Sequence, residues 1–178
     1  AILKQLKKDE YDVVGVGSQP DKKVGRKQVV TATPVHACAD AFGIEVYQPI
    51  SIKEGFEKIK QWDPELIVTC AYGQMIPVSI LEYPTYGSLN VHASLLPKLR
   101  GGAPIHKAIL YKEKETGVSI MRMVKKMAGA YMLQKKVLIG EDDTTEILHD
   151  KLMECGAEAI REAIPLLVEG KAVFIKAT

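Results

Sequence analysis

The amino-acid sequence predicts an α/β fold in which helices flank a mostly parallel β-sheet. Short apolar runs typical of strands alternate along the chain with amphipathic stretches typical of helices. The uncharged run LIVTCA (66–71) is typical of a strand buried in a parallel sheet. With 178 residues, 47% of them hydrophobic and 26% charged, the chain can form one domain with its own core.

Helices and strands alternate in the first half of the chain. Thr33 followed by Pro34 is typical of a helix start, and Gly43 is typical of a helix end. The expected elements are a helix over 1–9, a strand over 11–16, a helix over 33–43, a strand over 44–48, a helix over 53–62 that ends at Asp63-Pro64, and the strand over 66–71.

The second half continues with strands and two helices. Asp143 and Glu146 resemble a capping box that opens a long helix. The expected elements are a strand over 88–93, a helix over 103–112, a strand over 117–123, a strand over 131–139 paired with it, a helix over 144–167 and a last strand that ends within VFIKAT (173–178).

Composition excludes several classes of protein. The net charge of +2 is too small to indicate a nucleic-acid binder by itself, although a local basic patch could still bind one. No apolar run reaches the roughly 18 residues of a membrane span. Cys38, Cys70 and Cys155 match neither a zinc spacing nor a disulfide framework. We therefore expect reduced thiols, no metal and a cytoplasmic protein.

Asn90 and His92 form the first candidate for chemistry. They stand two residues apart at the end of a predicted strand, so their side chains point to the same face. Open α/β sheets bind ligands at the carboxyl ends of their strands. An amide and an imidazole side by side can stabilise an oxyanion in acyl or formyl transfer. The alternative is that His92 caps a turn while Asn90 satisfies loop backbone groups.

The segment after this pair suits a flat, partly apolar ligand. Ser94 to Pro97 place apolar side chains and a rigid proline beside the polar pair. Gly101 and Gly102 allow close backbone approach just before a helix N-terminus, where N–H groups favour an anion or a carbonyl oxygen. A plain connection from strand to helix is the alternative.

The segment NVHASLLPKLRGGAPIHKAI (90–109) resembles the signature of the methionyl-tRNA formyltransferases, within the 10-formyltetrahydrofolate-dependent formyltransferase family. The resemblance covers essentially the whole chain and implies the Rossmann-like formyltransferase fold. Further matching segments are VVGVGSQPDKKVGRK (13–27), DPELIVTCAYGQMIP (63–77), ETGVSIMRMVKKM (115–127) and PLLVEGKAVFIKAT (165–178).

The resemblance implies a role for particular residues. Asn90 and His92 match two members of the family's catalytic trio. The residues implied to bind 10-formyltetrahydrofolate are Ser94, Leu95, Leu96, Pro97, Tyr72, Gly73, Gln74, Met75 and Ile76. The residues implied to contact the acceptor end of tRNA are Lys22, Lys23, Arg26 and Lys27. Without the resemblance, this basic stretch would be interpreted as a solvated charged loop.

The third member of the trio is missing. The family usually reads M-D-x-G-D-M where this chain reads MAGAYM (127–132). A gapless alignment puts Ala128 in place of the first Asp and Tyr131 in place of the second, and an alignment with a gap restores the Ala-Gly match but still supplies no carboxylate. A carboxylate beside His92 would raise the imidazole pKa, orient the ring and accept a proton. Its loss should cost about 10²- to 10⁴-fold in rate. Either the domain is catalytically impaired or the sequence misreports this loop.

The resemblance implies transfer of a formyl group from 10-formyltetrahydrofolate to the amino group of initiator methionyl-tRNA, for translation initiation. One alternative is a formyltransferase acting on another amine, such as a nucleotide sugar or glycinamide ribonucleotide. Those relatives more often carry Pro at the position of Ala93 and lack the basic GRK segment. The other alternative is a non-catalytic folate- or RNA-binding module, which the missing Asp favours.

The domain organisation follows from the same resemblance. Residues 1–178 are expected to be one formyltransferase catalytic domain, as a fragment. The first strand of the family's sheet is expected to be absent, as is the C-terminal β-barrel domain that helps to bind tRNA. We expect a monomer that binds no membrane.

Overall fold

The computed structural model describes most of the chain. For residues 22–24, 29–31, 34 and 176 it describes the backbone alone. The described residues are 1–18, 22–24, 29–31, 34–70, 76–95, 105, 108–109, 114–123 and 130–176.

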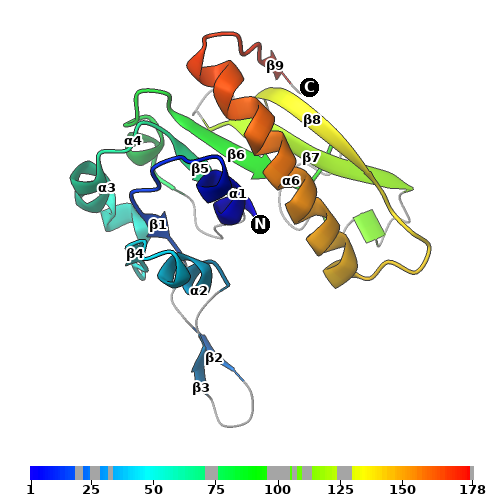
Figure 1. Ribbon diagram of the computed structural model, residues 1–178, viewed down its shortest axis with the longest axis horizontal. Coiled ribbons are helices and arrows are strands. Elements are labelled where there is room, and N and C mark those ends of the chain that lie inside the picture. The colour runs from blue at the N-terminus through cyan, green and yellow to red at the C-terminus, as the bar shows by residue number, and fades with distance from the viewer. Residues whose placement is uncertain are drawn as a thin grey trace.

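A five-stranded sheet forms the larger half of the fold (Figure 1). The first two strands of this sheet run parallel, and every later neighbour is antiparallel. In spatial order its strands are β5 (Ile67–Thr69), β6 (Ser88–His92), β7 (Glu115–Arg122), β8 (Ala130–Leu138) and β9 (Ile175–Lys176).

The long helix α6 (Thr145–Val168) covers one face of this sheet (Figure 1). Its buried residues recur at three- and four-residue spacing, because this spacing brings apolar side chains to one side of a helix. The core between helix and sheet is almost fully shielded from solvent. Its members larger than alanine that are exposed by 3% or less are Leu89, Val91, Val118, Ile120, Leu148, Leu152 and Ile160.

A second, two-stranded sheet lies beside the first. It consists of β1 (Val16–Gly17) and β4 (Val46–Tyr47), which run parallel. Two small apolar clusters pack around it. The surrounding elements are α1 (Ile2–Lys8), α2 (Pro34–Ala41), the 3₁₀ turn η1 (Ile52–Glu54), α3 (Phe56–Trp62) and α4 (Val78–Leu81).

These observations confirm the predicted α/β class with helices around the sheet. Parallel pairing joins β1 to β4 and β5 to β6, whereas the later strands pair antiparallel. The expected pairing of the strands near 117–123 and 131–139 is confirmed, as β7 with β8. Of the helix expected over 103–112, the structure describes Ile105, Ala108 and Ile109, each of them helical.

The strand expected over 11–16 is much shorter than predicted. Among the residues that the structure describes, Val16 and Gly17 alone of this stretch pair with a neighbour, namely β4. The apolar pattern was correct, but a strand exists only where a ladder of hydrogen bonds supports it. A third pair of strands, β2 (Lys22–Val24) and β3 (Val29–Thr31), runs antiparallel where a loop was expected. Figure 1 shows this pair projecting beyond α2.

A cleft of about 1000 Å³ separates β1 from β5. Its walls include every residue of 12–17 and of 63–70, so odd and even positions both face it. Side chains of alternating positions point to opposite faces of a strand, so this lining indicates two strand edges rather than a sheet face. Within the described part of the chain, β1 pairs only with β4 and β5 pairs only with β6.

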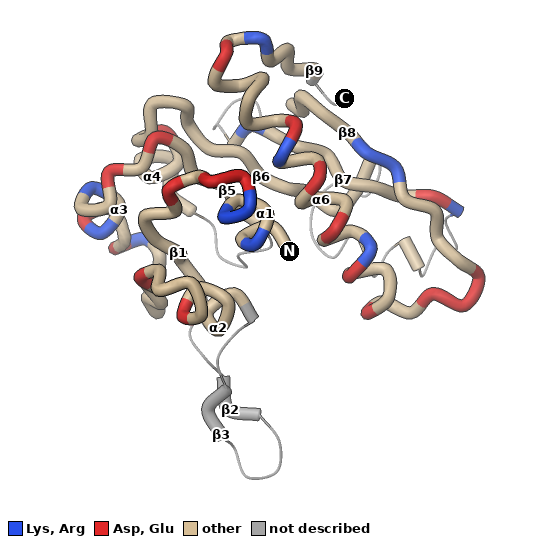
Figure 2. Tube along the Cα trace, viewed as in Figure 1, with Lys and Arg blue, Asp and Glu red and all other residues tan. Residues whose placement is uncertain are grey.

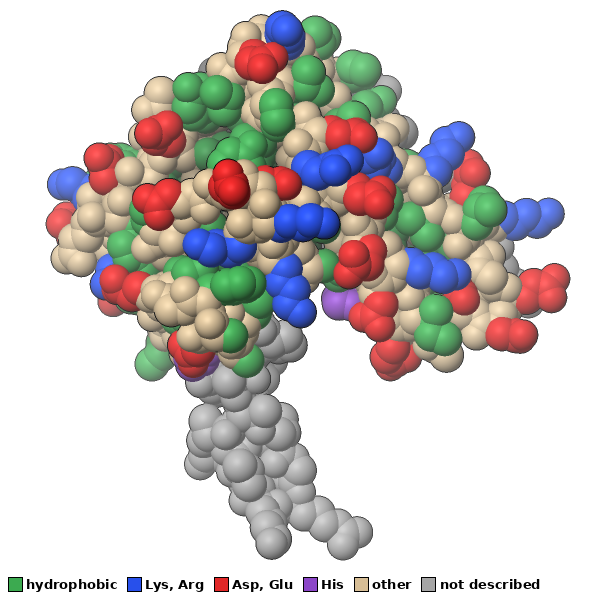
Figure 3. All heavy atoms as spheres, viewed as in Figure 1, with side chains coloured by type: hydrophobic (Ala, Val, Ile, Leu, Met, Phe, Trp, Pro, Cys, Tyr) green, Lys and Arg blue, Asp and Glu red, His purple; other side chains and the backbone are tan. Residues whose placement is uncertain are grey.

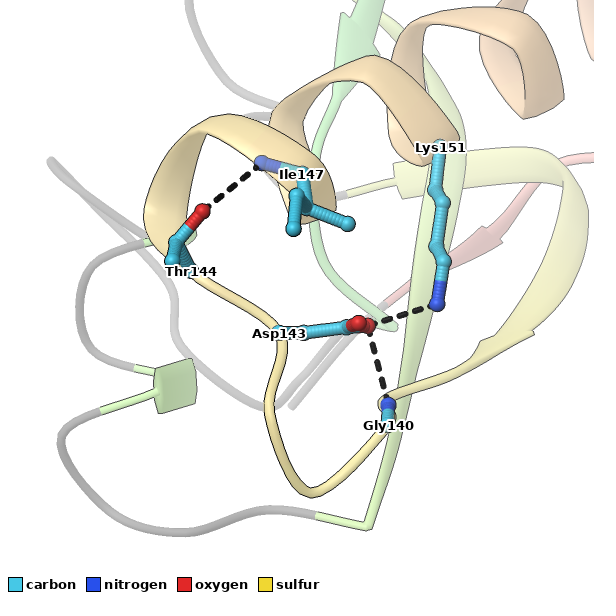
Figure 4. Close-up of polar contacts among 5 residues, drawn as sticks. All are labelled: Gly140, Asp143, Thr144, Ile147 and Lys151. Carbon is cyan, nitrogen blue, oxygen red and sulfur yellow. Dashed lines mark hydrogen bonds and ion pairs between the residues drawn. The ribbon is translucent and has the colours of Figure 1, made fainter.

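The start of α6 differs in one detail from the prediction (Figure 4). Thr144 is the N-cap, and its Oγ1 accepts a hydrogen bond of 3.2 Å from the Ile147 backbone N–H. Asp143, which was expected to cap the helix, instead accepts bonds from the Gly140 N–H at 2.9 Å and the Lys151 ammonium at 2.6 Å. These contacts, that of Lys151 above all, lower the pKa of the Asp143 carboxyl.

Charged residues of both signs are interspersed along the described chain (Figure 2). On the face shown in Figure 3, basic and acidic groups alternate, with no continuous basic patch among the described residues. A nucleic-acid interface normally carries such a patch. None of the helices described is long and apolar enough to cross a membrane.

Candidate functional site

Asn90 and His92 project from the same face of β6, as the sequence predicts. Their neighbours Leu89 and Val91 are 1% and 3% exposed and belong to the core beneath α6. Asn90 and His92 are half-buried, in alternation with those two residues. Because side chains alternate along a strand, the site lies on the face of the sheet opposite to α6.

A row of side chains crosses the sheet at Asn90. The register pairs Thr69 with Asn90, Asn90 with Met121, and Met121 with Tyr131. Paired residues of neighbouring strands point to the same face. Thr69 and Met121 both contact the Asn90 carboxamide, at 2.9 Å from Thr69 Oγ1 to Asn90 Oδ1 and 3.9 Å from Asn90 Nδ2 to Met121 Sδ.

A second row holds the backbone just after His92. His92 pairs with Ser119, and Ser119 pairs with Gln134. The Ser119 hydroxyl donates to the Ser94 carbonyl oxygen at 2.6 Å and accepts from Gln134 Nε2 at 2.9 Å. Ser94 and Ser119 are both fully buried. The start of the predicted folate-binding segment is therefore fixed to β7 and β8 by hydrogen bonds.

The Leu95 side chain packs closely against β7 because Gly117 has no side chain. A Cβ at Gly117 would lie 2.7 Å from Leu95 Cδ2 and 1.9 Å from the Lys135 carbonyl oxygen. Only glycine allows the β8 backbone and the Leu95 side chain to come this close. Ser94 and Leu95 are thus held in place beside Asn90 and His92, and we call these two residues the Ser94–Leu95 step.

The remaining predicted site residues are only partly described. Ile76 is half-buried and packs against the apolar cluster of Ile52, Ile59 and Ile80. Lys22 and Lys23 lie on β2, where the backbone alone is described. Outside the described residues lie Tyr72, Gly73, Gln74, Met75, Leu96, Pro97, Gly101, Gly102, Arg26, Lys27 and Ala128.

Tyr131, which the gapless alignment puts at the position of the second Asp, lies on β8 in the same row as Asn90. A β-bulge between Ile120 and Met121 sets this register, since Ile120 pairs with Leu133 and Met121 with Tyr131. Two strand spacings of about 4.8 Å separate Tyr131 from Asn90. Its phenol can donate or accept a hydrogen bond, but it is no carboxylate.

The described residues contain no group of three or more His, Cys, Asp or Glu placed to hold a metal ion. Cys70 packs against the core, with its Sγ 3.9 Å from Met153 Sδ. Burial raises the pKa of this thiol, as is typical of a small cysteine packed in a core.

Three residues that support the site, Thr69, Ser119 and Gln134, were not predicted from the sequence. All three support site residues through contacts between strands distant in sequence. A signal was present in two of them, because Thr69 and Ser119 are hydroxyl residues within the apolar runs LIVTCA and GVSIMRM. Buried hydroxyl groups need hydrogen-bond partners, so such residues indicate a contact across the sheet.

Comparison with known proteins decides the family. A family model described as "Formyl transferase" matches residues 1–164. The chain belongs to this formyl transferase family. Methionyl-tRNA formyltransferase from Bacillus cytotoxicus is 53% identical over 178 residues, which cover 98% of this chain and 57% of that protein. The Bacillus mycoides protein of the same name is 52% identical, and the match again covers 98% of this chain and 57% of that protein.

Solved structures with low sequence identity to this chain share its fold. Glycinamide ribonucleotide transformylase 1 from Symbiobacterium toebii aligns with a TM-score of 0.75 at 21% identity, over 95% of this chain and 81% of that one. A formyltetrahydrofolate deformylase from Pseudomonas syringae pv. tomato aligns with a TM-score of 0.75 at 17% identity, over 99% of this chain and 60% of that chain. This chain spans little more than half the length of the methionyl-tRNA formyltransferases that it matches.

Proposed function

We propose that this domain transfers the formyl group of 10-formyltetrahydrofolate to the amino group of initiator methionyl-tRNA. The proposal rests on one observation: Asn90 and His92 project from the same face of β6, directly before the Ser94–Leu95 step, which hydrogen bonds hold in place. The identity of 53% to a methionyl-tRNA formyltransferase supports this choice of acceptor amine. In this role we expect a cytoplasmic monomer.

The two polar side chains have separate tasks. The Asn90 amide donates a neutral hydrogen bond towards the formyl oxygen as negative charge develops there, and the His92 imidazole adds a second donor. Donors fixed before the reaction stabilise such charge without reorganisation during it. 10-Formyltetrahydrofolate supplies the formyl group when bound. The Ser94–Leu95 step fits a flat, partly apolar molecule, because its backbone is held in place and its Leu95 side chain is apolar.

His92→Ala in the full-length protein tests this assignment. We expect formylation of methionyl-tRNA to be abolished, while the affinity for a folate analogue, measured by equilibrium titration, stays largely intact. His149→Ala is the matched control, because His149 is an exposed residue of α6 beside Asp150. Loss of folate binding together with activity would contradict the assignment.

Ala128 decides between an active domain and a binding module. Without a carboxylate at this position, we expect turnover about 10²- to 10⁴-fold below that of an Asp-containing relative. Ala128→Asp should restore much of that rate. Tight binding of a folate analogue without turnover, even after Ala128→Asp, would favour a non-catalytic folate-binding module. A peptide mass covering 124–134 would show whether MAGAYM is the true sequence.

We also propose that residues 1–178 form the catalytic domain of a longer polypeptide. The cleft between β1 and β5 supports this proposal, because two strand edges face it and one extended strand between them would join both sheets. The inserted strand would keep β1 and β5 about 9.6 Å apart, twice the spacing of neighbouring strands. The C-terminal β-barrel domain remains a prediction from the resemblance.

A cysteine pair can test for the inserted strand. In full-length protein with its native cysteines replaced by Ala, Val14→Cys with Val68→Cys should form no disulfide, because a bridge needs Cα atoms within about 7 Å. Val16→Cys with Val46→Cys is the positive control, since these two residues are neighbours in register. Ready oxidation of the Val14–Val68 pair would show that the cleft closes and that no strand lies in it.

The basic segment from Lys22 to Lys27 is our candidate for the tRNA contact. Its support is the match to the family's basic segment and the projection of β2 and β3 beyond α2 (Figure 1). Replacing Lys22, Lys23, Arg26 and Lys27 by Ala should raise the KM for methionyl-tRNA and flatten its dependence on salt. Unchanged salt dependence would place the contact elsewhere.

A further inference from the structure

Thr69 places a hydroxyl group against the carboxamide of Asn90. Thr69 Oγ1 lies 2.9 Å from Asn90 Oδ1 and, at a weaker 3.5 Å, from the Leu89 carbonyl oxygen. Thr69 is 9% exposed, and the parallel register of β5 and β6 pairs it directly with Asn90. The contact therefore joins two neighbouring strands inside the sheet and does not depend on a loop.

The surroundings of Asn90 determine which way its amide points. The Met121 sulfur lies 3.9 Å from Asn90 Nδ2, and a thioether can accept a hydrogen bond but cannot donate one. The amide nitrogen therefore belongs on the side of Met121. The amide oxygen then faces Thr69, whose hydroxyl is the donor of the 2.9 Å bond.

We propose that Thr69 is a positioning residue for the catalytic amide. Its hydroxyl holds Asn90 Oδ1, so that the amide N–H, and not the amide oxygen, is presented to the formyl oxygen. A carboxamide turned by 180° would place a lone pair against the developing negative charge. The bond from Thr69 also polarises the amide, which makes its N–H a stronger donor. This inference rests on the proposed function of Asn90.

Thr69→Val removes the hydroxyl and keeps the shape of the side chain. We expect kcat to fall about 3- to 10-fold, the range of one neutral hydrogen bond, with the KM for 10-formyltetrahydrofolate unchanged. Thr69→Ser keeps the hydroxyl and should restore kcat. In an Asn90→Ala background, where loss of the oxyanion donor costs about 10²- to 10³-fold, Thr69→Val should add nothing.

Thr116→Val is the matched control for these measurements. Thr116 is another buried strand threonine, 3% exposed, and it lies on β7 five residues before Met121. Its replacement should leave kcat unchanged. Equal losses in Thr69→Val and Thr116→Val, or failure of Thr69→Ser to rescue, would show that Thr69 has a general structural role and would overturn the proposal.

A spectroscopic measurement separates this inference from the proposed function. In ¹⁵N-labelled full-length protein, the side-chain amide signals that vanish in Asn90→Asp belong to Asn90. These signals should shift and broaden in Thr69→Val, where the amide can turn, but not in Thr116→Val. If they are unchanged in Thr69→Val, the positioning role is refuted. The Asn90 signals can change in Thr69→Val while neither the wild type nor Ala128→Asp formylates tRNA. In that case the proposed function is wrong, but the positioning of Asn90 by the Thr69 hydrogen bond is supported.

Discussion

Ser119→Ala offers a quantitative test of how the site is held. The Ser119 hydroxyl makes two hydrogen bonds in a fully buried position, one to the Ser94 carbonyl oxygen and one from the Gln134 amide. A net contribution of about 1 kcal/mol for each predicts a loss of about 2 kcal/mol in the free energy of unfolding. For a domain of this size, the loss corresponds to a fall of about 4–8 °C in Tm.

Ser88→Ala is the matched control on the neighbouring strand. Ser88 is 1% exposed, and its hydroxyl donates one bond of 2.6 Å to the Leu81 carbonyl oxygen. We expect this variant to lose about 1 kcal/mol, half the loss in Ser119→Ala. Calorimetric unfolding of the full-length protein measures both losses. Because Ser88 lies at the far end of β6 from Ser94, only Ser119→Ala should also weaken binding of a folate analogue.

Two outcomes would refute this reasoning. If Ser119→Ala costs no more stability than Ser88→Ala, the bonds to Ser94 and Gln134 do not act as the structure indicates. If it loses stability but binds the folate analogue as tightly as the wild type, Ser94 does not belong to the binding segment.

Two further predictions concern Gly117 and the start of α6. Gly117→Ala should destabilise the domain by about 3 kcal/mol or more and weaken folate-analogue binding, because its Cβ would lie 1.9 Å from the Lys135 carbonyl oxygen. Gly17→Ala is the control and should be nearly neutral, because no described residue beyond its chain neighbours has an atom within 4 Å of that Cβ. Equal stability of the two variants would contradict the close approach at Gly117. The pKa of Asp143 is lowered by Lys151, so its contribution to stability is complete above the ordinary carboxyl pKa near 4 and is lost as the pH falls through the lower folded value. The stability difference between wild type and Asp143→Asn, measured by urea unfolding, should therefore shrink below about pH 4, whereas the difference for Thr144→Ala should stay constant with pH.

Patterns within one element were predictable from the sequence. The two-residue spacing of Asn90 and His92 predicted that both side chains lie on one face of a strand. The structure confirms this, and Leu89 and Val91, which alternate with them, belong to the core. The long amphipathic helix after residue 143 was correct in position and length to within a residue at each end. Such patterns are local, because period and capping are properties of adjacent residues.

Features that depend on distant partners were not predictable. The strand over 11–16 needed a neighbour along its whole length, and the structure supplies one for Val16 and Gly17 alone. The contacts of Thr69 with Asn90 and of Ser119 with Ser94 depend on sheet register, which joins residues more than 20 positions apart. The cap at Thr144 was assigned to its neighbour Asp143, because both residue types favour that position and only the geometry separates them.

The alternation along β6 also has a consequence for dynamics. The strand pairs with β5 over Ser88–Asn90 and with β7 over Leu89–His92, and Leu89 and Val91 fix it in the core. Backbone amides in such a strand exchange with solvent only when the whole domain opens. The peptide groups of Asn90 and His92 should therefore be among the slowest to exchange deuterium. The proposed catalytic pair, Asn90 and His92, is thus tied to the global unfolding equilibrium. Any adaptation of the site to substrates must come from the segments around this pair.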